Sequence, residues 1–162
     1  MSRSLITSAK KQSASPALQQ LITLKEVYLA NRYPNVPANF RPKPKYEDNT
    51  ANGLTRCILD FIRFSGGFAT RIQSQGQYRP GINGRRGQYT YGNTRKGTAD
   101  IHAVANGFHI SVEVKIGKDR MSKAQRLMQT DIQKAGGHYF VAHTFQDFYE
   151  FFTAEFLTPP FA

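Results

Sequence analysis

Residues 106–116 constrain the fold of this chain more than any other segment. From Phe108 to Ile116 apolar and polar residues alternate strictly, which is the pattern of a half-buried β-strand. The preceding Asn106-Gly107 pair tolerates positive φ at both positions and predicts a two-residue hairpin turn. The sequence therefore predicts a β-hairpin in which Ala105 faces Phe108, so that the numbers of paired residues sum to 213.

This register places two carboxylates together. Asp100 faces Glu113, and Lys115 lies on the same strand face as Glu113. Opposed side chains have Cβ atoms about 4.5–5.5 Å apart, and like charges there destabilise the pair. A bound Mg²⁺ or Mn²⁺ is the usual compensation, because these ions prefer carboxylate and carbonyl oxygens. The Val114 carbonyl is a candidate third ligand, and Lys115 is positioned to orient or help deprotonate a water. The alternative is an ordinary solvated sheet face with a cross-strand ion pair.

Composition narrows the class of protein. The chain has 162 residues, with 22 Lys and Arg against 11 Asp and Glu, which gives a net charge of +11. Such a charge favours binding to nucleic acid or to an anionic membrane surface, although a merely soluble basic protein is the alternative. The single cysteine excludes an intrachain disulfide and a cysteine-based zinc site. We expect a cytoplasmic protein, because the sequence shows neither an apolar run near 18 residues nor a hydrophobic signal region.

The order of predicted elements indicates an α/β protein. Residues 1–46 form a basic N-terminal extension with a short helix and a Pro-rich linker, and residues 47–162 form the compact domain. Within the domain the patterns predict, in order, a helix, three strands, a helix, a strand and a helix. The second helix begins at a capping box, Ser122-Lys-Ala-Gln125.

Residues 73–97 are the predicted DNA-contacting surface. This Gly-rich segment has no acidic residue and contains interleaved tyrosines, a combination that suits phosphate neutralisation and stacking on bases. The alternative is a flexible loop whose charge is incidental. The candidate DNA-binding residues, which include three outside the segment, are Arg71, Arg79, Arg85, Arg86, Arg95, Lys96, Lys118 and Arg120.

Three short motifs together resemble a known family. Gly97-Thr-Ala-Asp100, then Glu113-Val-Lys115, then Ser122-x-x-Gln125 are similar to motifs of the PD-(D/E)XK nuclease superfamily, most closely the VRR-NUC type. The resemblance implies a restriction-endonuclease-like core: a helix, a three-stranded antiparallel meander, a helix and a strand. It also implies that Asp100 and Glu113 are metal ligands, that Lys115 is the catalytic lysine and that Gln125 is an accessory active-site residue. Stand-alone members are associated with branched DNA such as Holliday junctions.

The sequence departs from the family pattern at one position. Many members have a glutamate early in the first core helix, where this chain has Asn52, with Glu47 a turn or more upstream. Three alternatives follow: Asn52 substitutes weakly for this glutamate, Glu47 reaches the metal site, or the metal site has fewer acids. Gln125 also has an alternative role, because a residue at the fourth position of a capping box can simply bond the Ser122 amide.

The sequence thus predicts an Mg²⁺- or Mn²⁺-dependent DNA endonuclease that acts as a homodimer, without a small-molecule cofactor and without a membrane partner. The main alternative is a nuclease-fold DNA-binding module with weak or no catalysis. A further alternative is a basic protein that binds RNA or a membrane surface.

Overall fold

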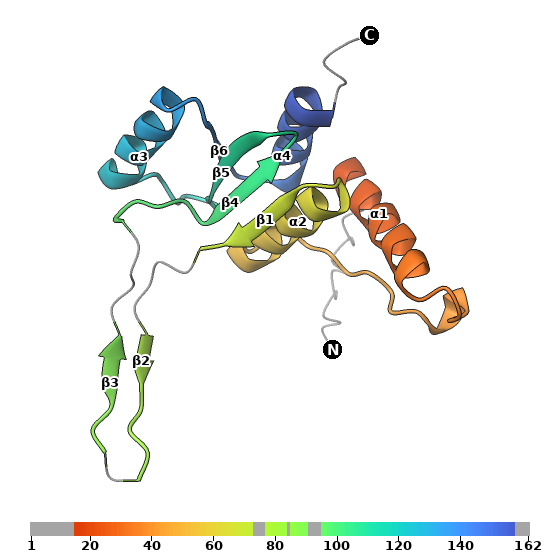
Figure 1. The fold of residues 1–162 in the computed structure, drawn as a ribbon, viewed down its shortest axis with the longest axis horizontal. Helices are drawn as coiled ribbons and strands as arrows, with labels where there is room; N and C mark the ends of the chain where they lie inside the picture. Colours follow the sequence, from red (N-terminus) through yellow and green to blue (C-terminus); the bar gives the residue numbers. More distant parts are fainter. Residues whose placement is uncertain (1–14, 73–76, 84, 91–94, 158–162) are drawn as a thin grey trace, which may run out of the picture.

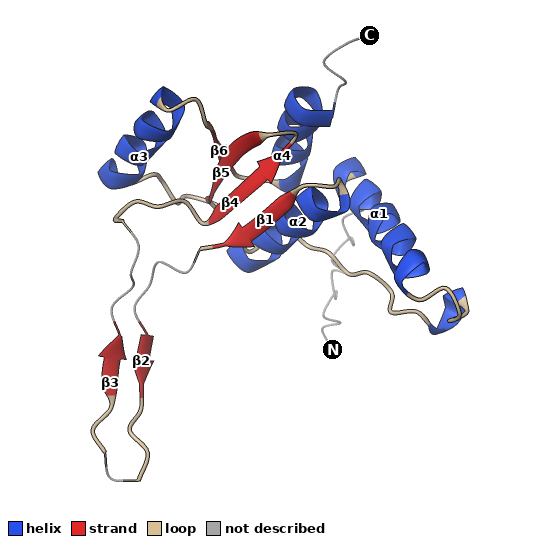
Figure 2. Ribbon diagram, in the orientation of Figure 1, coloured by secondary structure: helices blue, strands red, loops and turns tan. Residues whose placement is uncertain are grey.

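The computed structural model describes residues 15–72, 77–83, 85–90 and 95–157, which form a mixed α/β fold (Figures 1 and 2). None of the helices in these ranges is long and apolar enough to cross a membrane. The elements, in chain order, are α1 (Pro16–Arg32), a 3₁₀ turn (Ala38–Phe40), α2 (Ala51–Phe64), β1 (Phe68–Arg71), β2 (Gln77–Arg79), β3 (Gln88–Thr90), β4 (Ile101–Ala105), β5 (Phe108–Val114), α3 (Lys123–Lys134), β6 (His138–Ala142), α4 (Phe145–Phe152) and a π-helical turn (Thr153–Leu157).

Four strands form the main sheet, in the order β1-β4-β5-β6. The pairs β1–β4 and β4–β5 are antiparallel, and β6 is parallel to β5. The predicted hairpin and its register are confirmed: Ala105 pairs with Phe108 and Ile101 with Val112. The turn has φ of 48° at Asn106 and 84° at Gly107, the positive values that a tight two-residue hairpin requires.

The hydrophobic core lies on one face of this sheet. The buried side chains of β5 on that face, such as Ile110 and Val112, join residues of α1, α2 and α4 in one cluster. Aromatic rings dominate the cluster, and Phe61 of α2 contacts Phe145 and Phe152 of α4 edge-on. The intervening residues of β5 point to the other face, where α3 lies. One face of β5 therefore packs in the core, and the other face carries polar residues.

Helix α1 belongs to the same core. Ala17, Leu18 and Leu21 are buried in the cluster with α2 and α4. The Ala17 N–H also donates to Gln146 Oε1 of α4, at 3.1 Å. The predicted boundary at residue 46 stays a prediction about sequence organisation, but the hydrophobic core of the described chain extends across it.

One pair of strands was not predicted from the sequence. The segment 73–97, to which the sequence patterns assigned no strand, contains β2 and β3, which pair antiparallel as a separate two-stranded ribbon. Figure 1 shows this ribbon projecting away from the main sheet; residues 73–76, 84 and 91–94 lie outside the described ranges.

We predict that truncating one side chain of α1 destabilises the whole domain. Leu21 is fully buried, so Leu21→Ala is expected to lower the free energy of unfolding by about 2–5 kcal/mol in urea denaturation. Val27→Ala on the same helix is the control, because Val27 is 55% exposed and should cost little. Equal, small effects of both changes would contradict a core that includes α1.

Candidate active site

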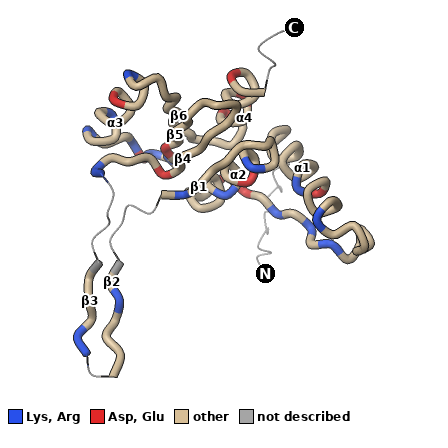
Figure 3. Tube along the Cα trace, viewed as in Figure 1, with Lys and Arg blue, Asp and Glu red and all other residues tan. Residues whose placement is uncertain are grey.

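Asp100, Glu113 and Lys115 gather where β4 begins and β5 ends. The antiparallel ladder ends with the pair Ile101 and Val112. One step further, the Val114 N–H donates to Asp100 Oδ2 at 2.9 Å, so the carboxylate replaces a ladder carbonyl as acceptor. This bond fixes Asp100 against β5. Figure 3 shows acidic positions at this end of β4 and β5, on the side nearest α3.

Glu113 is a buried carboxylate with one oxygen bonded and one without a partner. Its exposed fraction is only 2%. Oε1 accepts hydrogen bonds from Lys115 Nζ at 3.1 Å and from the Gln125 side-chain amide. Oε2 is buried and has no hydrogen-bond partner within the described residues. Burial, then the charge of Asp100, raises the pKa of Glu113 to about 7.

Lys115 lies between two carboxylates. Its Nζ is 3.1 Å from Glu113 Oε1 and 3.2 Å from Asp119 Oδ2. Burial alone would lower the pKa of Lys115, but hydrogen bonds to Glu113 and Asp119 outweigh it and raise that pKa. Lys115 is therefore an ammonium ion in this state. An ammonium can orient a water or stabilise negative charge, whereas accepting a proton would first require it to lose one.

The Gln125 side chain makes the predicted capping bond and also contacts Glu113. Its Oε1 accepts from the Ser122 N–H at 2.8 Å, which completes the predicted capping box of α3. Its Nε2 donates to Glu113 Oε1. The amide has one acceptor and two donors, so a single side chain caps the helix and holds the buried carboxylate.

The start of α3 is fixed by the loop that carries the Gly97-Thr-Ala-Asp100 motif. Gly97 has φ of 88°, and a Cβ there would come within 2.5 Å of the Ala124 carbonyl group. Arg95 pairs with Asp131 of α3 at 2.8 Å. The glycine of the motif thus allows the close approach between its loop and the helix that positions Gln125.

The donor set suits a hard divalent cation. Asp100 and Glu113 provide two carboxylates, and the buried oxygen of Glu113 lacks a partner, as expected for a ligand atom. The N–H and C=O of one residue in an antiparallel ladder face the same neighbour, so the Val114 carbonyl faces the side occupied by Asp100. Within the described ranges, no group of three or more His, Cys, Asp or Glu side chains is placed to hold a metal ion. Asp100, Glu113 and the Val114 carbonyl stay the predicted ligands for Mg²⁺ or Mn²⁺, as a set of two carboxylates and one backbone oxygen.

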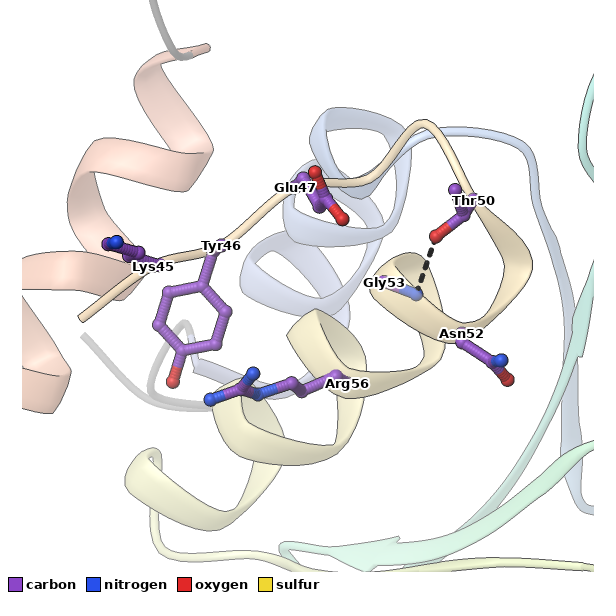
Figure 4. Close-up of a pocket in the computed structure, with 7 residues that line it drawn as sticks. All are labelled: Lys45, Tyr46, Glu47, Thr50, Asn52, Gly53 and Arg56. Carbon is purple, nitrogen blue, oxygen red and sulfur yellow. Dashed lines mark hydrogen bonds between the residues drawn. The ribbon is translucent and has the colours of Figure 1, made fainter.

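Glu47 and Asn52 line a separate pocket of about 420 Å³ at the start of α2. Figure 4 shows them on opposite sides of the first turn of the helix, with the Asn52 amide pointing away from Glu47. Of the hydrogen bonds described, none joins either side chain to Asp100, Glu113 or Lys115. A role for either residue in the site therefore stays a prediction.

The candidate DNA-binding residues fall into three groups. Arg79, Arg85 and Arg86 are exposed on the ribbon, and Arg71 is exposed at the end of β1. Arg95 and Lys96 precede the motif loop. Lys118 and Arg120 lie in a pocket that also contains Lys115. Figure 3 shows the basic positions spread over the ribbon and the adjoining loops.

Several residues near Glu113 and Lys115 were not predicted from the sequence. Tyr139 of β6 lies on the same sheet face as Glu113, and its pKa is raised by burial and by the charges of Glu113 and Asp100. Asp119 binds Lys115, and Arg126 and His143 line the same pocket as Lys115. In the sequence, Tyr139 is marked only by its polar group on a strand beside apolar residues. Its neighbours become evident only from the parallel pairing of β6 with β5.

No protein-family model matches the sequence, and a comparison with curated proteins finds no match. The interpretation of the site therefore depends on its own geometry and chemistry.

We predict a pH-dependent stability that depends on Glu113. A carboxyl whose pKa rises from 4.5 to about 7 on folding binds more protons when folded, so stability is lost as pH rises through this window. In chelator, wild type should lose up to about 3 kcal/mol relative to Glu113→Gln between pH 4.5 and 8.

Thermal and urea unfolding of both proteins across this range provide the measurement. Adding Mg²⁺ or Mn²⁺ at pH 8 should stabilise wild type but not Glu113→Gln, because binding to the folded state raises stability. Parallel pH profiles of the two proteins would contradict the assignment.

Proposed function

We propose that this protein is an Mg²⁺- or Mn²⁺-dependent DNA endonuclease of the PD-(D/E)XK type. One observation carries the proposal: Asp100, a buried Glu113 with an unpartnered oxygen, and the Lys115 ammonium converge at one end of β5. Two carboxylates and a lysine in this arrangement suit hydrolysis of a phosphodiester, in which a cation and an ammonium stabilise the charge that develops on phosphate.

Each residue has a distinct part in the proposed reaction. Asp100, Glu113 and the Val114 carbonyl would hold the metal ion, which lowers the pKa of a bound water and polarises the phosphate. Lys115, charged in this structure, would orient the attacking water and stabilise the pentacovalent phosphorus centre. Gln125 is a positioning residue, since it holds Glu113 Oε1 and leaves Oε2 without a protein partner.

The ribbon of β2 and β3 supports DNA as the substrate. Tyr78 and Tyr89 pair across its strands, and both are exposed by half or more. Two-stranded ribbons fit the major groove of duplex DNA, and the arginines beyond Tyr78 would neutralise phosphates. Branched DNA is the substrate suggested by the family resemblance. A homodimer would supply the second active site that cutting two strands requires.

The second candidate is a DNA-binding module with the same fold and little turnover. The sequence departure at Asn52 favours it, because an amide at that position cannot add a third carboxylate to Asp100 and Glu113. The buried Glu113, to which both Lys115 and Gln125 are bonded, favours the enzyme, since a binding surface has no need of a buried carboxylate. An RNA- or lipid-binding protein would instead show tight binding to those partners without DNA affinity.

We predict metal-dependent cleavage that requires Asp100 and Lys115. Labelled duplex, flap and four-way-junction DNA is incubated with Mg²⁺ or Mn²⁺, and products are resolved on denaturing gels. Asp100→Asn and Lys115→Ala should each reduce the rate at least about 100-fold, because each removes transition-state stabilisation. Asp147→Asn and Lys134→Ala, which change the same residue types elsewhere on the surface, are the controls.

Wild type that binds DNA but never cleaves it with either metal would establish the binding module instead. Cleavage that survives both substitutions would show that the site is elsewhere.

We predict that the tip of the ribbon contributes phosphate contacts. The double variant Arg85→Gln/Arg86→Gln should bind duplex DNA more weakly, and the slope of log Kd against log salt concentration should fall by about 2. Arg32→Gln/Lys134→Gln, which makes the same change in net charge away from the ribbon, should leave the slope nearly unchanged. Equal slopes for both double variants would exclude the ribbon from the interface.

A further inference from the structure

A basic pocket of about 540 Å³ is lined by Lys115, and Glu113 is not among its lining residues. Its charged lining residues are Lys115, Lys118, Arg120 and Arg126, with the carboxylate of Asp119 among them; His143 adds a ring nitrogen. The volume lies within the range of roughly 300–1,000 Å³ that is typical of small-molecule sites. Four cations in one concavity favour an anionic ligand.

Asp119 already occupies this pocket as an internal anion. Its Oδ2 is 3.2 Å from Lys115 Nζ, and its Oδ1 accepts from the Arg120 N–H at 2.8 Å. The Asp119 side chain is nevertheless 60% exposed, whereas that of Lys115 is 8% exposed. The ammonium is thus buried and fixed by Glu113, while its second carboxylate partner is at the surface and can turn into solvent.

The walls of the pocket are held by bonds that do not involve Asp119. Arg126 Nη1 donates to the Met121 carbonyl at 2.8 Å, which fixes the end of the loop to the first turn of α3. His143 Nδ1 is 3.2 Å from the Lys115 carbonyl, which fixes the segment after β6 to the end of β5. Moving the Asp119 side chain would therefore leave the bonds that hold Arg126 and His143 intact.

We propose that this pocket binds a phosphate group, and that the phosphate takes the place of the Asp119 carboxylate on Lys115. A phosphate oxygen would accept from Lys115 Nζ, while Arg120 and Arg126 contact the remaining oxygens; arginine suits such paired contacts. In the absence of ligand, Asp119 keeps Lys115 neutralised. The identity of the ligand as a phosphodiester of nucleic acid rests on the proposed function, whereas phosphate binding itself does not.

The test measures binding in chelator, where no cleavage occurs. Binding of inorganic phosphate is followed by calorimetry, and binding of a fluorescent trinucleotide by anisotropy. Asp119→Asn should tighten both about two- to fivefold, because the ion pair between Asp119 and Lys115 then no longer competes with the ligand. Arg120→Gln and Arg126→Gln should weaken both, and Lys134→Gln at the far end of α3 is the matched control. Arg120→Gln is included because Arg126→Gln also removes the bond to Met121.

The outcomes distinguish nucleic acid from free phosphate as the ligand. They also distinguish the pocket proposal from the nuclease proposal. A trinucleotide that binds more tightly than inorganic phosphate, and loses that advantage with an uncharged methylphosphonate backbone, identifies nucleic acid as the ligand. Phosphate that binds as tightly as the trinucleotide, with the same response to the variants, identifies free phosphate and overturns only the nucleic-acid assignment. Unchanged affinities in Asp119→Asn and Arg120→Gln overturn the pocket itself. Absence of metal-dependent cleavage, by contrast, would affect only the nuclease proposal.

Discussion

The buried Glu113 carboxylate is the interaction on which the arrangement of the site depends. A carboxylate with 2% exposure is costly unless it is paired and hydrogen-bonded. Here Lys115 provides the opposite charge, and Gln125 provides a neutral donor from another element. Removing Lys115 would leave the charge of Glu113 uncompensated in the interior, and removing Gln125 would take away a hydrogen bond to it. The position of α3 and the conformation of Lys115 therefore both follow from the requirement to satisfy one buried oxygen.

The topology of the sheet explains why these groups meet. Strand β5 is central, with antiparallel β4 on one side and parallel β6 on the other. Asp100 reaches the end of β5 from the β4 side, and the Lys115 N–H donates to the Ala142 carbonyl from the β6 side. Helix α3 is the connection between β5 and β6, so it must cross one face of the sheet, and it crosses the face that bears Glu113. The polar alternation of β5 and the position of the helix are thus consequences of the same connection.

Local sequence patterns predicted the secondary structure better than they predicted the contacts within the site. The hairpin register followed from Asn106-Gly107 and strict alternation, and the start of α3 followed from its capping box, because both are encoded within a few residues. The burial of Glu113, the contact between Lys115 and Asp119, and the neighbourhood of Tyr139 depend on elements far apart in the sequence. The ribbon was missed for a different reason: β2 and β3 are three residues each and are flanked by glycine-rich segments, so alternation was too short to detect.

The carboxylate pair of the site is negative, whereas the ribbon and the pocket around it are positive. The chain has an excess of 11 positive charges, yet the half-buried Asp100 and the buried Glu113 meet at one end of β5. An approaching phosphate would be attracted by the basic ribbon and pocket, and repelled by the carboxylate pair itself. A divalent cation between the carboxylates removes that repulsion, because its two positive charges offset the charges of the two acids. The acid pair and the basic surround are therefore complementary only when a cation binds, which is the electrostatic reason to expect DNA binding outside the site and metal dependence within it.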